Sequence, residues 1–493
     1  MNEETPYGYT SMSGKHGHKR GNDMNQNTVT TDTPKQNQIT EGVIWKQLLL
    51  FFFPILFGTF FQQLYNTADA VIVGRFVGKE ALAAVGGPTG PLINLLIGFF
   101  IGLSSGAGVI ISQFYGARQE KRVSRAVHTA IAFSILCGAI LMVVGILAAP
   151  YALMAMGTPD EILYYAVLYM RIYFVGVIPN LVYNMGAGIL RAIGDSRRPL
   201  YFLIASCFTN IILDIIFVVY WHMGVMGAAL ATIISQLLSA VLVVLVLMRT
   251  REAYHLTPKA IRIHKAMLWR IVRIGFPAGL QSVMYSASNI IIQSSVNSLG
   301  TDTIAAWTAY GKIDSVFWMI ISAFGISITT FVGQNYGAGK KDRIYKGIRV
   351  CMIMSFASAV VLSILLYTFG NYVYLLFTTD EAVIQKGTQI LRYLAPTFFT
   401  YVCIEIYSGS LRGVGDCWIP MILTSLGVCA LRVVWICVAV PLRPTIETVI
   451  FSYPLTWTAT SLLFIAYFNW FGKLKRKTPP GIPLCLKRRA EKG

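Results

Sequence analysis

The sequence predicts an all-α membrane protein with twelve transmembrane helices in two six-helix lobes, related by an internal pseudo-two-fold axis. Hydrophobic residues make up 55% of the 493 residues and charged residues only 13%, whereas about 25% of a typical soluble domain is charged. Apolar runs of roughly 20 residues recur along nearly the whole chain, and each is long enough to cross a bilayer of about 30 Å. Two motifs return at one common offset of 221 residues, which indicates an internal duplication.

The repeated motifs mark corresponding points in the two halves. Segment 113–117 (QFYGA) returns at 334–338 (QNYGA), and segment 190–195 (LRAIGD) returns at 411–416 (LRGVGD). We interpret the LRxxGD phrases as structural latches or gate elements at cytoplasmic helix ends, where Arg and Asp can form interhelix salt bridges, with substrate binding as the alternative. The QxYGA phrases also end a span at this face, with Gly at the helix C-terminus. Because the motifs share one offset, each half should carry the same helices in the same order, and a functional site should lie between the halves.

Twelve apolar runs define the predicted spans. We expect them at 44–73, 84–112, 126–149, 163–189, 199–220, 225–248, 271–298, 304–333, 347–370, 386–410, 418–441 and 447–471. The chain then divides into a disordered polar tail at 1–42, an N-lobe at 43–248, a linker at 249–270, a C-lobe at 271–471 and a basic tail at 472–493. The first tail lacks hydrophobic periodicity and cannot bury enough surface to fold.

The loops between the spans alternate in charge. Segments 118–125, 249–273 and 340–346 are rich in Lys and Arg, whereas 159–161 and 379–381 are neutral or acidic. Cytoplasmic loops of membrane proteins carry an excess of Lys and Arg. We therefore expect a multi-pass protein of the plasma membrane or bacterial inner membrane with both termini in the cytoplasm.

The composition excludes several classes of function. The net charge of +19 is spread over short loops, so we expect the lipid bilayer, and not nucleic acid, as the partner of this charge. The eight cysteines show no CxxC pair or ligand spacing, and we interpret them as small core residues. There is no phosphate-binding loop, HExxH or GxSxG motif. We therefore expect no enzymatic activity and no cofactor, and any transport must draw on an ion gradient.

Ionisable residues inside apolar spans are the most informative side chains. Asp69 lies late in the first span, and Asn210 and Asp214 share one face of the fifth because they are four residues apart. An aspartate at membrane depth costs at least about 2.5 kcal/mol. With the hydroxyl of Thr232 in the sixth span, these groups could form an oxygen cage for Na⁺ or a pair of acids that share a proton. The alternative is that both acids only bond neighbouring helices.

The second half carries fewer candidates. Glu405 is a lone acid in the tenth span, where it could bind a cationic substrate or bond a neighbouring helix, and the nearby ring of Tyr401 would suit a flat cation. We add Asn66 and Gln293, in the first and seventh spans, as candidates for the same substrate cleft. Asp314 lies two residues from Lys312, so the two side chains point to different faces of the helix and need other partners.

Three further phrases carry a resemblance to a known family. Residues 64–69 (LYNTAD), 73–78 (VGRFVG) and 81–86 (ALAAVG), with the two doubled motifs, resemble multidrug and toxic compound extrusion (MATE) transporters over about residues 43–471. The resemblance implies two six-helix lobes around a V-shaped cleft. It also implies secondary active antiport, by alternating access, that exports drugs or other organic, cationic compounds against Na⁺ or H⁺.

The resemblance also implies where the coupling ion binds. The family's amino-terminal lobe carries an acid in the first helix, an Asn and an Asp four apart in the fifth, and a Thr in the sixth, which correspond to Asp69, Asn210, Asp214 and Thr232. Some branches instead use acids in the seventh and tenth helices. This chain has no acid in the seventh span, which favours the amino-terminal site.

Two other functions stay open at this stage. Relatives of this fold move lipid-linked saccharides, and such a flippase would need a cleft lined with cations for pyrophosphate. A channel or structural membrane protein is the alternative of another class, although an internal two-fold with unpaired acids suits a carrier better. In the preferred interpretation the partners are small organic substrates and the bilayer, and the protein is a monomer.

Overall fold

Helices account for almost all of the chain that the structure describes. The computed structural model describes residues 38–87 and 89–470, and no strand occurs in them. The polar leader before residue 38 and the predicted basic tail at 472–493 lie outside the described residues.

The first half contains six spans. Its helices are α1 (Gln38–Glu41), α2 (Ile44–Phe76), α3 (Lys79–Gly86), α4 (Thr89–Gly116), α5 (Glu120–Ala155), α6 (Asp160–Val175), α7 (Val177–Ile193), α8 (Arg197–Asp214) with a π-helical turn at Ile215–Tyr220, and α9 (Gly224–Arg249). The linker contains a 3₁₀ turn at Pro258–Ala260. α6 and α7 together make the fourth span.

The second half repeats this order. Its helices are α10 (Lys265–Asn297), α11 (Thr301–Gly337), α12 (Lys341–Leu375), α13 (Glu381–Leu394), α14 (Phe399–Gly413), α15 (Trp418–Thr424), α16 (Leu431–Leu442) and α17 (Ile446–Trp470). A 3₁₀ turn at Ala395–Thr397 joins α13 to α14, and a π-helical turn at Ser425–Ala430 joins α15 to α16. Each predicted span therefore has its helix or broken helix.

Two spans that the sequence predicts as continuous are broken. α6 and α7 meet at an angle of 49°, and Pro179 near the start of α7 cannot donate to the carbonyl of Val175. Pro396 interrupts the tenth span in the same way. Among the described helices, nine are long and apolar enough to cross a membrane, or ten with the bent pair; the broken α13–α14 and the polar α10 complete the twelve.

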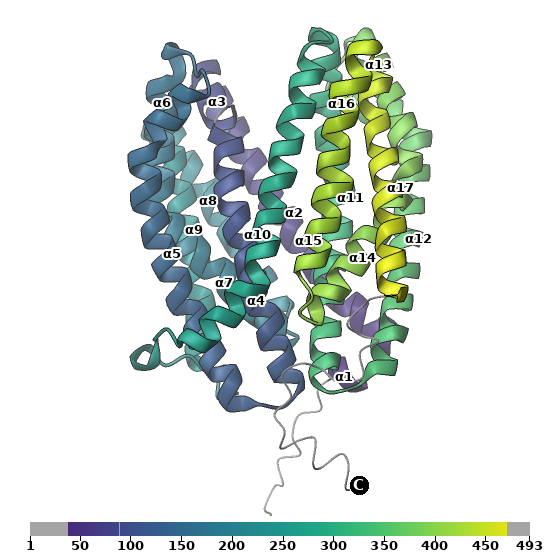
Figure 1. The fold of residues 1–493 in the computed structure, drawn as a ribbon. Coiled ribbons are helices and arrows are strands. Elements are labelled where there is room, and N and C mark those ends of the chain that lie inside the picture. The colour runs from purple at the N-terminus through teal and green to yellow at the C-terminus, as the bar shows by residue number, and fades with distance from the viewer. Residues whose placement is uncertain (1–37, 88, 471–493) are drawn as a thin grey trace, which may run out of the picture. The chain divides into compact units, whose positions relative to one another are not determined.

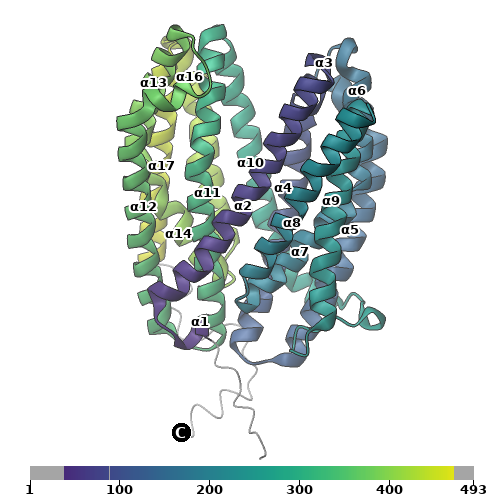
Figure 2. The ribbon, with the colours of Figure 1, turned by 180° about the vertical axis from the view of Figure 1, so that it is seen from behind.

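The first helix of each half crosses from one lobe to the other. We call α3–α9 the N-lobe and α11–α17 the C-lobe. Leu48 and Phe52 at the start of α2 belong to the C-lobe core, where Phe52 stacks on Phe324 at 4.1 Å between ring centroids. Met267 and Ile271 at the start of α10 belong to the N-lobe core. Both helices run obliquely between the two groups (Figure 1, Figure 2), so lobe boundaries at 43–248 and 271–471 stay a prediction.

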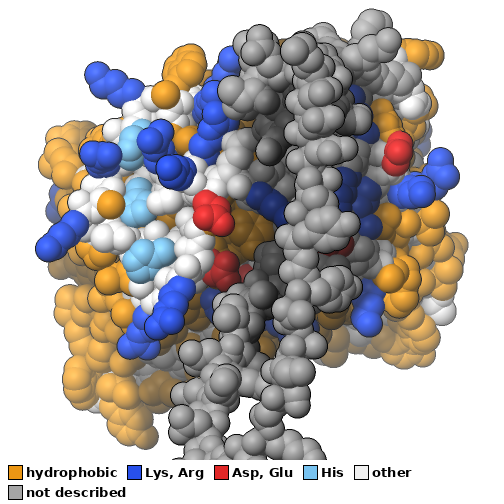
Figure 3. All heavy atoms as spheres, turned by 90° about the horizontal axis from the view of Figure 1, so that it is seen from below, with side chains coloured by type: hydrophobic (Ala, Val, Ile, Leu, Met, Phe, Trp, Pro, Cys, Tyr) orange, Lys and Arg blue, Asp and Glu red, His pale blue; other side chains and the backbone are white. Residues whose placement is uncertain are grey.

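The linker is held against the N-lobe. Tyr254 and Leu256 are buried in the N-lobe core, and the backbone N–H of Thr257 donates to Nε2 of His128 at 3.0 Å. The linker loop lies at the same end of the helices as the α4–α5 and α11–α12 loops. We call this end the basic end, because Lys and Arg side chains surround it while few Asp or Glu are visible (Figure 3).

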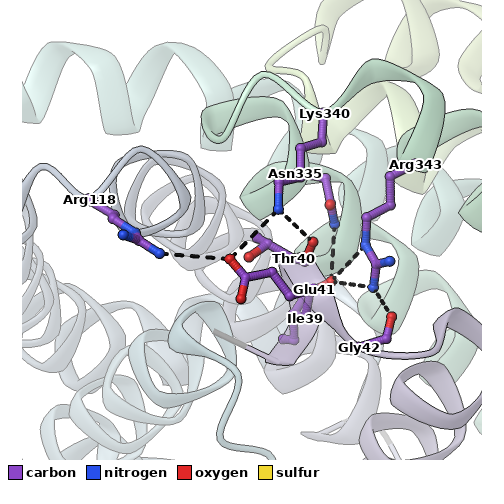
Figure 4. A network of polar contacts seen from close by, with 8 residues as sticks. All are labelled: Ile39, Thr40, Glu41, Gly42, Arg118, Asn335, Lys340 and Arg343. Atoms are coloured by element: carbon purple, nitrogen blue, oxygen red, sulfur yellow. Dashed lines mark hydrogen bonds and ion pairs between the residues drawn. The ribbon is translucent and has the colours of Figure 1, made fainter. Parts of the chain in front are cut away.

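A short amino-terminal segment joins the lobes at the basic end. We call residues 38–42, which the sequence placed in the polar tail, the amino-terminal strap. The carboxylate of Glu41 lies 3.7 Å from Arg118 of the N-lobe and 3.8 Å from Lys340 of the C-lobe. Arg343 donates to the carbonyl of Ile39 at 3.0 Å. The strap therefore carries contacts from both halves (Figure 4).

Candidate functional site

The four residues predicted to form an ion site come together where α2 packs against α8 and α9 of the N-lobe. Asp69 lies on α2, Asn210 and Asp214 on α8, and Thr232 on α9, and their exposed fractions are 6%, 0%, 0% and 4%. α2 packs against α8, and α8 packs against α9. Burial follows because each residue sits on the face of its helix that these contacts cover.

Most polar atoms of this group have no hydrogen-bond partner among the described residues. Oδ1 of Asp69, both carboxylate oxygens of Asp214, and Oδ1 and Nδ2 of Asn210 are buried without a hydrogen bond to the described chain. Asp69 and Asp214 lie close enough for their charges to act on each other, so one shared proton would relieve their repulsion. Burying a charge without a partner is costly, so this arrangement calls for a cation or a proton.

A fifth residue, which the sequence analysis missed, completes what we call the acceptor cluster. Oε1 of Gln236 is also buried without a donor from the described chain, and its amide lies beside Tyr65 and Tyr173. Gln236 follows Thr232 by four residues on α9, so both share one helix face. The same spacing of four residues placed Asn210 and Asp214 on one face of α8.

The oxygen atoms of the acceptor cluster are suitable ligands for a hard monovalent cation or for protons. Carboxylate, amide and hydroxyl oxygens are the ligands that hard cations prefer. The hydroxyl of Thr232 donates to the carbonyl of Ala228 at 3.0 Å, which leaves its oxygen lone pairs free to accept or to coordinate. The same oxygens could hold protons, so the chemistry of the cluster fits both Na⁺ and H⁺.

The C-lobe acid Asp314 has a different environment. Trp318 donates to its Oδ2 at 2.6 Å and Tyr310 to its Oδ1 at 3.3 Å. The buried guanidinium of Arg432, which the sequence analysis did not consider, lies 4.1 Å from the ring centre of Tyr453 and contributes positive charge near Asp314. This acid is therefore supplied with donors, whereas the acceptor cluster is not.

A cavity of about 550 Å³ lies between the lobes. We call it the central cavity. Its wall comes from α4 and α7 of the first half and from α10, α11 and α14 of the second. Hydroxyl and amide groups alternate with aliphatic side chains along the wall, and the polar character of α10 reflects its place there.

The central cavity contains two of the four predicted substrate residues. Glu405 and Tyr401 line it, whereas Asn66 and Gln293 are not among its lining residues. Asn66 is exposed, and Gln293 donates to Asn297 at 2.8 Å. Whether any of the four binds substrate stays a prediction.

Glu405 is not a lone acid. Nη2 of Arg412 lies 3.0 Å from its Oε1, and both side chains are about four-fifths buried, with exposed fractions of 22% and 20%. Arg412 follows Glu405 by seven positions on α14, which is about two helical turns, so both side chains lie on one face of the helix. This pairing could therefore have been predicted from the spacing in the sequence. The hydroxyl of Tyr401 shares a hydrogen bond with Tyr285 at 3.0 Å.

The repeated motifs meet each other across the lobes. Nε2 of Gln113 donates to the carbonyl of Gly413 at 2.8 Å, and Nε2 of Gln334 donates to the carbonyl of Ala192 at 2.7 Å. Each QxYGA motif therefore binds the LRxxGD motif of the other half, and the two bonds are related by the internal repeat. The latches expected from the sequence thus connect the two halves, and they do so through glutamine side chains.

Glycine allows the backbones to approach at this contact. A Cβ on Gly116 would lie 2.0 Å from the carbonyl oxygen of Gln334, and a Cβ on Gly337 would lie 1.9 Å from that of Gln113. No side chain fits at either position without separation of α4 and α11. Together with the reciprocal glutamine bonds, these contacts form what we call the motif seam.

Comparison with known proteins identifies relatives along most of the chain. The MatE family model matches residues 54–216 and 277–438, one match in each half. The chain is 30% identical over 444 residues to the probable multidrug resistance protein YoeA of Bacillus subtilis, covering 88% of this chain and 96% of that protein. It is 24% identical to the multidrug export protein MepA of Staphylococcus aureus, over 76% and 82% of the two chains.

Solved structures share the fold. A MOP superfamily transporter from Pyrococcus furiosus superposes with a TM-score of 0.82 at 23% identity, over 88% of this chain and 97% of that one. A multidrug resistance MATE family transporter in an outward-facing conformation gives the same TM-score, identity and coverage. These matches support the twelve-helix, two-lobe architecture.

Proposed function

This chain belongs to the MatE family of multidrug transporters, and we propose that it is a cation-coupled antiporter that exports drugs or other organic compounds by alternating access. Members of this family move compounds across membranes and are not enzymes. The observation that carries the proposal is the acceptor cluster, whose buried oxygens have no protein donors among the described residues. The coupling ion, Na⁺ or H⁺, binds there.

The acceptor cluster is placed where ion binding can affect both lobes. α2 carries Asp69 at one end and packs its other end into the C-lobe. When the cluster is empty, Asp69 and Asp214 repel each other in a site of low dielectric constant. Binding a cation or proton removes this repulsion and favours close packing of α2 on α8. The ion therefore stabilises one lobe arrangement over the other, as coupling requires.

The motif seam supports alternating access. It closes one side of the region between the lobes through two hydrogen bonds and two glycine contacts. An arrangement open to that side requires both glutamine bonds to break. Because the repeat relates the two bonds, the lobes can separate there as two rigid units.

The orientation follows from charge. We assign the basic end to the cytoplasm, since Lys and Arg concentrate in cytoplasmic loops. Both termini then lie in the cytoplasm, and the motif seam faces it. We propose a monomer, as the sequence analysis expects.

The experiment is efflux of a fluorescent dye from cells or inverted vesicles, with Na⁺ and pH gradients imposed separately. Export should follow one gradient and be lost in Asp69→Asn and in Asp214→Asn, while both variants reach the membrane and remain monodisperse. Asp160→Asn is the matched control, because Asp160 is exposed at the start of α6. Normal gradient-driven export by both cluster variants would sink the proposal.

One observation supports the alternative function of a lipid-linked saccharide flippase. Such a transporter needs cations in its cleft for pyrophosphate, and Arg191 and Arg412 line the central cavity. Movement of a lipid-linked pyrophosphate analogue between leaflets, without efflux of soluble dyes, would favour it. Ion-driven flux that saturates with substrate would exclude the channel.

A further inference from the structure

The charged groups of the central cavity carry an excess of positive charge. Among the described residues that line it, only Arg191, Glu405 and Arg412 have charged side chains. Two arginines and one glutamate leave one unit of positive charge. A cleft lined by an excess of one charge attracts ligands of the opposite charge, so this cavity favours an anionic ligand.

The two arginines are equivalent positions of the internal repeat. Arg191 ends α7 of the N-lobe and Arg412 ends α14 of the C-lobe, both within the LRxxGD motif. Asp195 of the first motif does not neutralise Arg191. Its carboxylate accepts from the backbone of residues 197 and 198 at 3.1 Å and pairs with the side chain of Arg198 at 3.2 Å. The repeat therefore directs one guanidinium from each lobe into one cavity.

The two guanidinium groups differ in their partners. Arg412 uses Nη2 for Glu405, and its buried Nε has no hydrogen bond within the described chain. In the part of the chain that the structure describes, the guanidinium of Arg191 has neither an ion pair nor a hydrogen bond. Five donors of Arg191 and the remaining donors of Arg412 are thus available to a ligand.

We propose that the central cavity binds organic anions or zwitterions, whose carboxylate or other oxyacid group is held by Arg191 together with Arg412. Guanidinium groups recognise such groups through paired, charge-assisted hydrogen bonds. Aliphatic side chains such as Ile101 and Ile274 line the same cavity and suit an apolar body. The proposal rests on the proposed function and names its substrate class.

This differs from the cationic substrate that the sequence favours. That expectation depends on a free Glu405, and the carboxylate is occupied by Arg412. A ligand that bears an acid group competes with Glu405 for Arg412. A cation would have to displace Arg412 from Glu405 and leave two arginines unpaired.

The test is equilibrium binding of carboxyfluorescein, an organic anion, and of ethidium, a cation of similar flatness, to the purified full-length protein. Arg191→Gln should weaken carboxyfluorescein binding about tenfold or more, which corresponds to the loss of one charged hydrogen-bonding partner. Arg197→Gln is the matched control, since Arg197 is exposed at the start of α8, six positions further along the chain. Arg191→Lys retains the charge and should recover part of the affinity.

Glu405→Gln separates the two substrate classes most sharply. It removes the competitor for Arg412, so carboxyfluorescein should bind more tightly, whereas a cation site would bind ethidium more weakly. Unchanged carboxyfluorescein binding in Arg191→Gln, or loss of ethidium binding in Glu405→Gln, would overturn the proposal. If Arg191→Gln does not fold, Arg191→Lys and Glu405→Gln still decide it.

Two further measurements separate related outcomes. Dodecyl phosphate as competitor distinguishes a lipid-like phosphate from a soluble anion: displacement by it, but not by benzoate, would assign the site to a lipid headgroup and overturn the soluble class. Binding uses no ion gradient. Anion binding without gradient-driven export would therefore refute the antiporter and leave this inference standing.

Discussion

Replacing Gly116 by alanine should open the motif seam. The added Cβ would lie 2.0 Å from the carbonyl oxygen of Gln334, and ordinary contact begins near 3.4 Å, so α4 and α11 must separate by the difference of 1.4 Å. The bonds from Gln113 to Gly413 at 2.8 Å and from Gln334 to Ala192 at 2.7 Å would then be stretched or lost. Overpacking of this kind costs about 1–3 kcal/mol.

That cost should fall mainly on the arrangement with a closed seam. A difference of about 1–3 kcal/mol between two conformations shifts their ratio about 5- to 150-fold. Cys417, which is 4% exposed and lines the central cavity beside the seam, can report the shift. With the other cysteines replaced by alanine, its reaction with an impermeant methanethiosulfonate in inverted vesicles should accelerate severalfold or more in Gly116→Ala.

A matched control lies on the same helix. A Cβ on Gly90 of α4 would meet nothing within 4 Å, so Gly90→Ala should leave labelling unchanged. Gly337→Ala should reproduce the effect of Gly116→Ala, because its Cβ would lie 1.9 Å from the carbonyl oxygen of Gln113. Equal labelling in wild type and both seam variants, with normal folding, would refute the seam as the closure.

Further predictions concern the strap, the acceptor cluster and the C-lobe core. Arg343→Gln removes the hydrogen bonds from this side chain to the carbonyl of Ile39 and should raise Cys417 labelling modestly. High salt should do the same, because it screens the exposed ion pairs of the strap, which contribute at most about 1 kcal/mol. Unchanged labelling under both conditions would show that the strap does not stabilise closure. Gln236→Leu removes one buried acceptor and should raise the Na⁺ or H⁺ concentration needed for half-maximal export, without lowering the maximum. Trp457→Ala empties a site only 1% exposed and should cost about 3–5 kcal/mol of unfolding free energy, measured as a lower melting temperature; an unchanged Tm would contradict the described packing.

The twelve spans could be predicted because their signals are local. Runs of about 20 apolar residues identify membrane helices whatever the rest of the chain does. The breaks at Gly176 and at Ala395–Thr397 were missed, although Pro179 and Pro396 were visible in the sequence. Proline is tolerated in membrane helices when neighbours satisfy the freed backbone, so its presence alone does not decide between a kink and a break.

Part of the acceptor cluster could be predicted because its signals are also local in the sequence. Asp69 and Asp214 stood out by the cost of a carboxylate in the membrane, and Asn210 by its spacing from Asp214. Gln236 was overlooked because a neutral amide carries a smaller cost, although its spacing from Thr232 was available. The pairing of Glu405 with an arginine two turns later was equally readable from the sequence.

The sequence by itself determined the membrane class, the duplication and the order of the helices, because hydrophobicity and repeat spacing are properties of the chain. Only the tertiary structure decided that α2 and α10 cross between the lobes and that Gln113 contacts Gly413, 300 residues away. It also decided that Arg191 and Arg412 line one cavity. Such contacts depend on how packed helices are rotated and tilted, and the residues that fix those angles are distributed over every helix in contact.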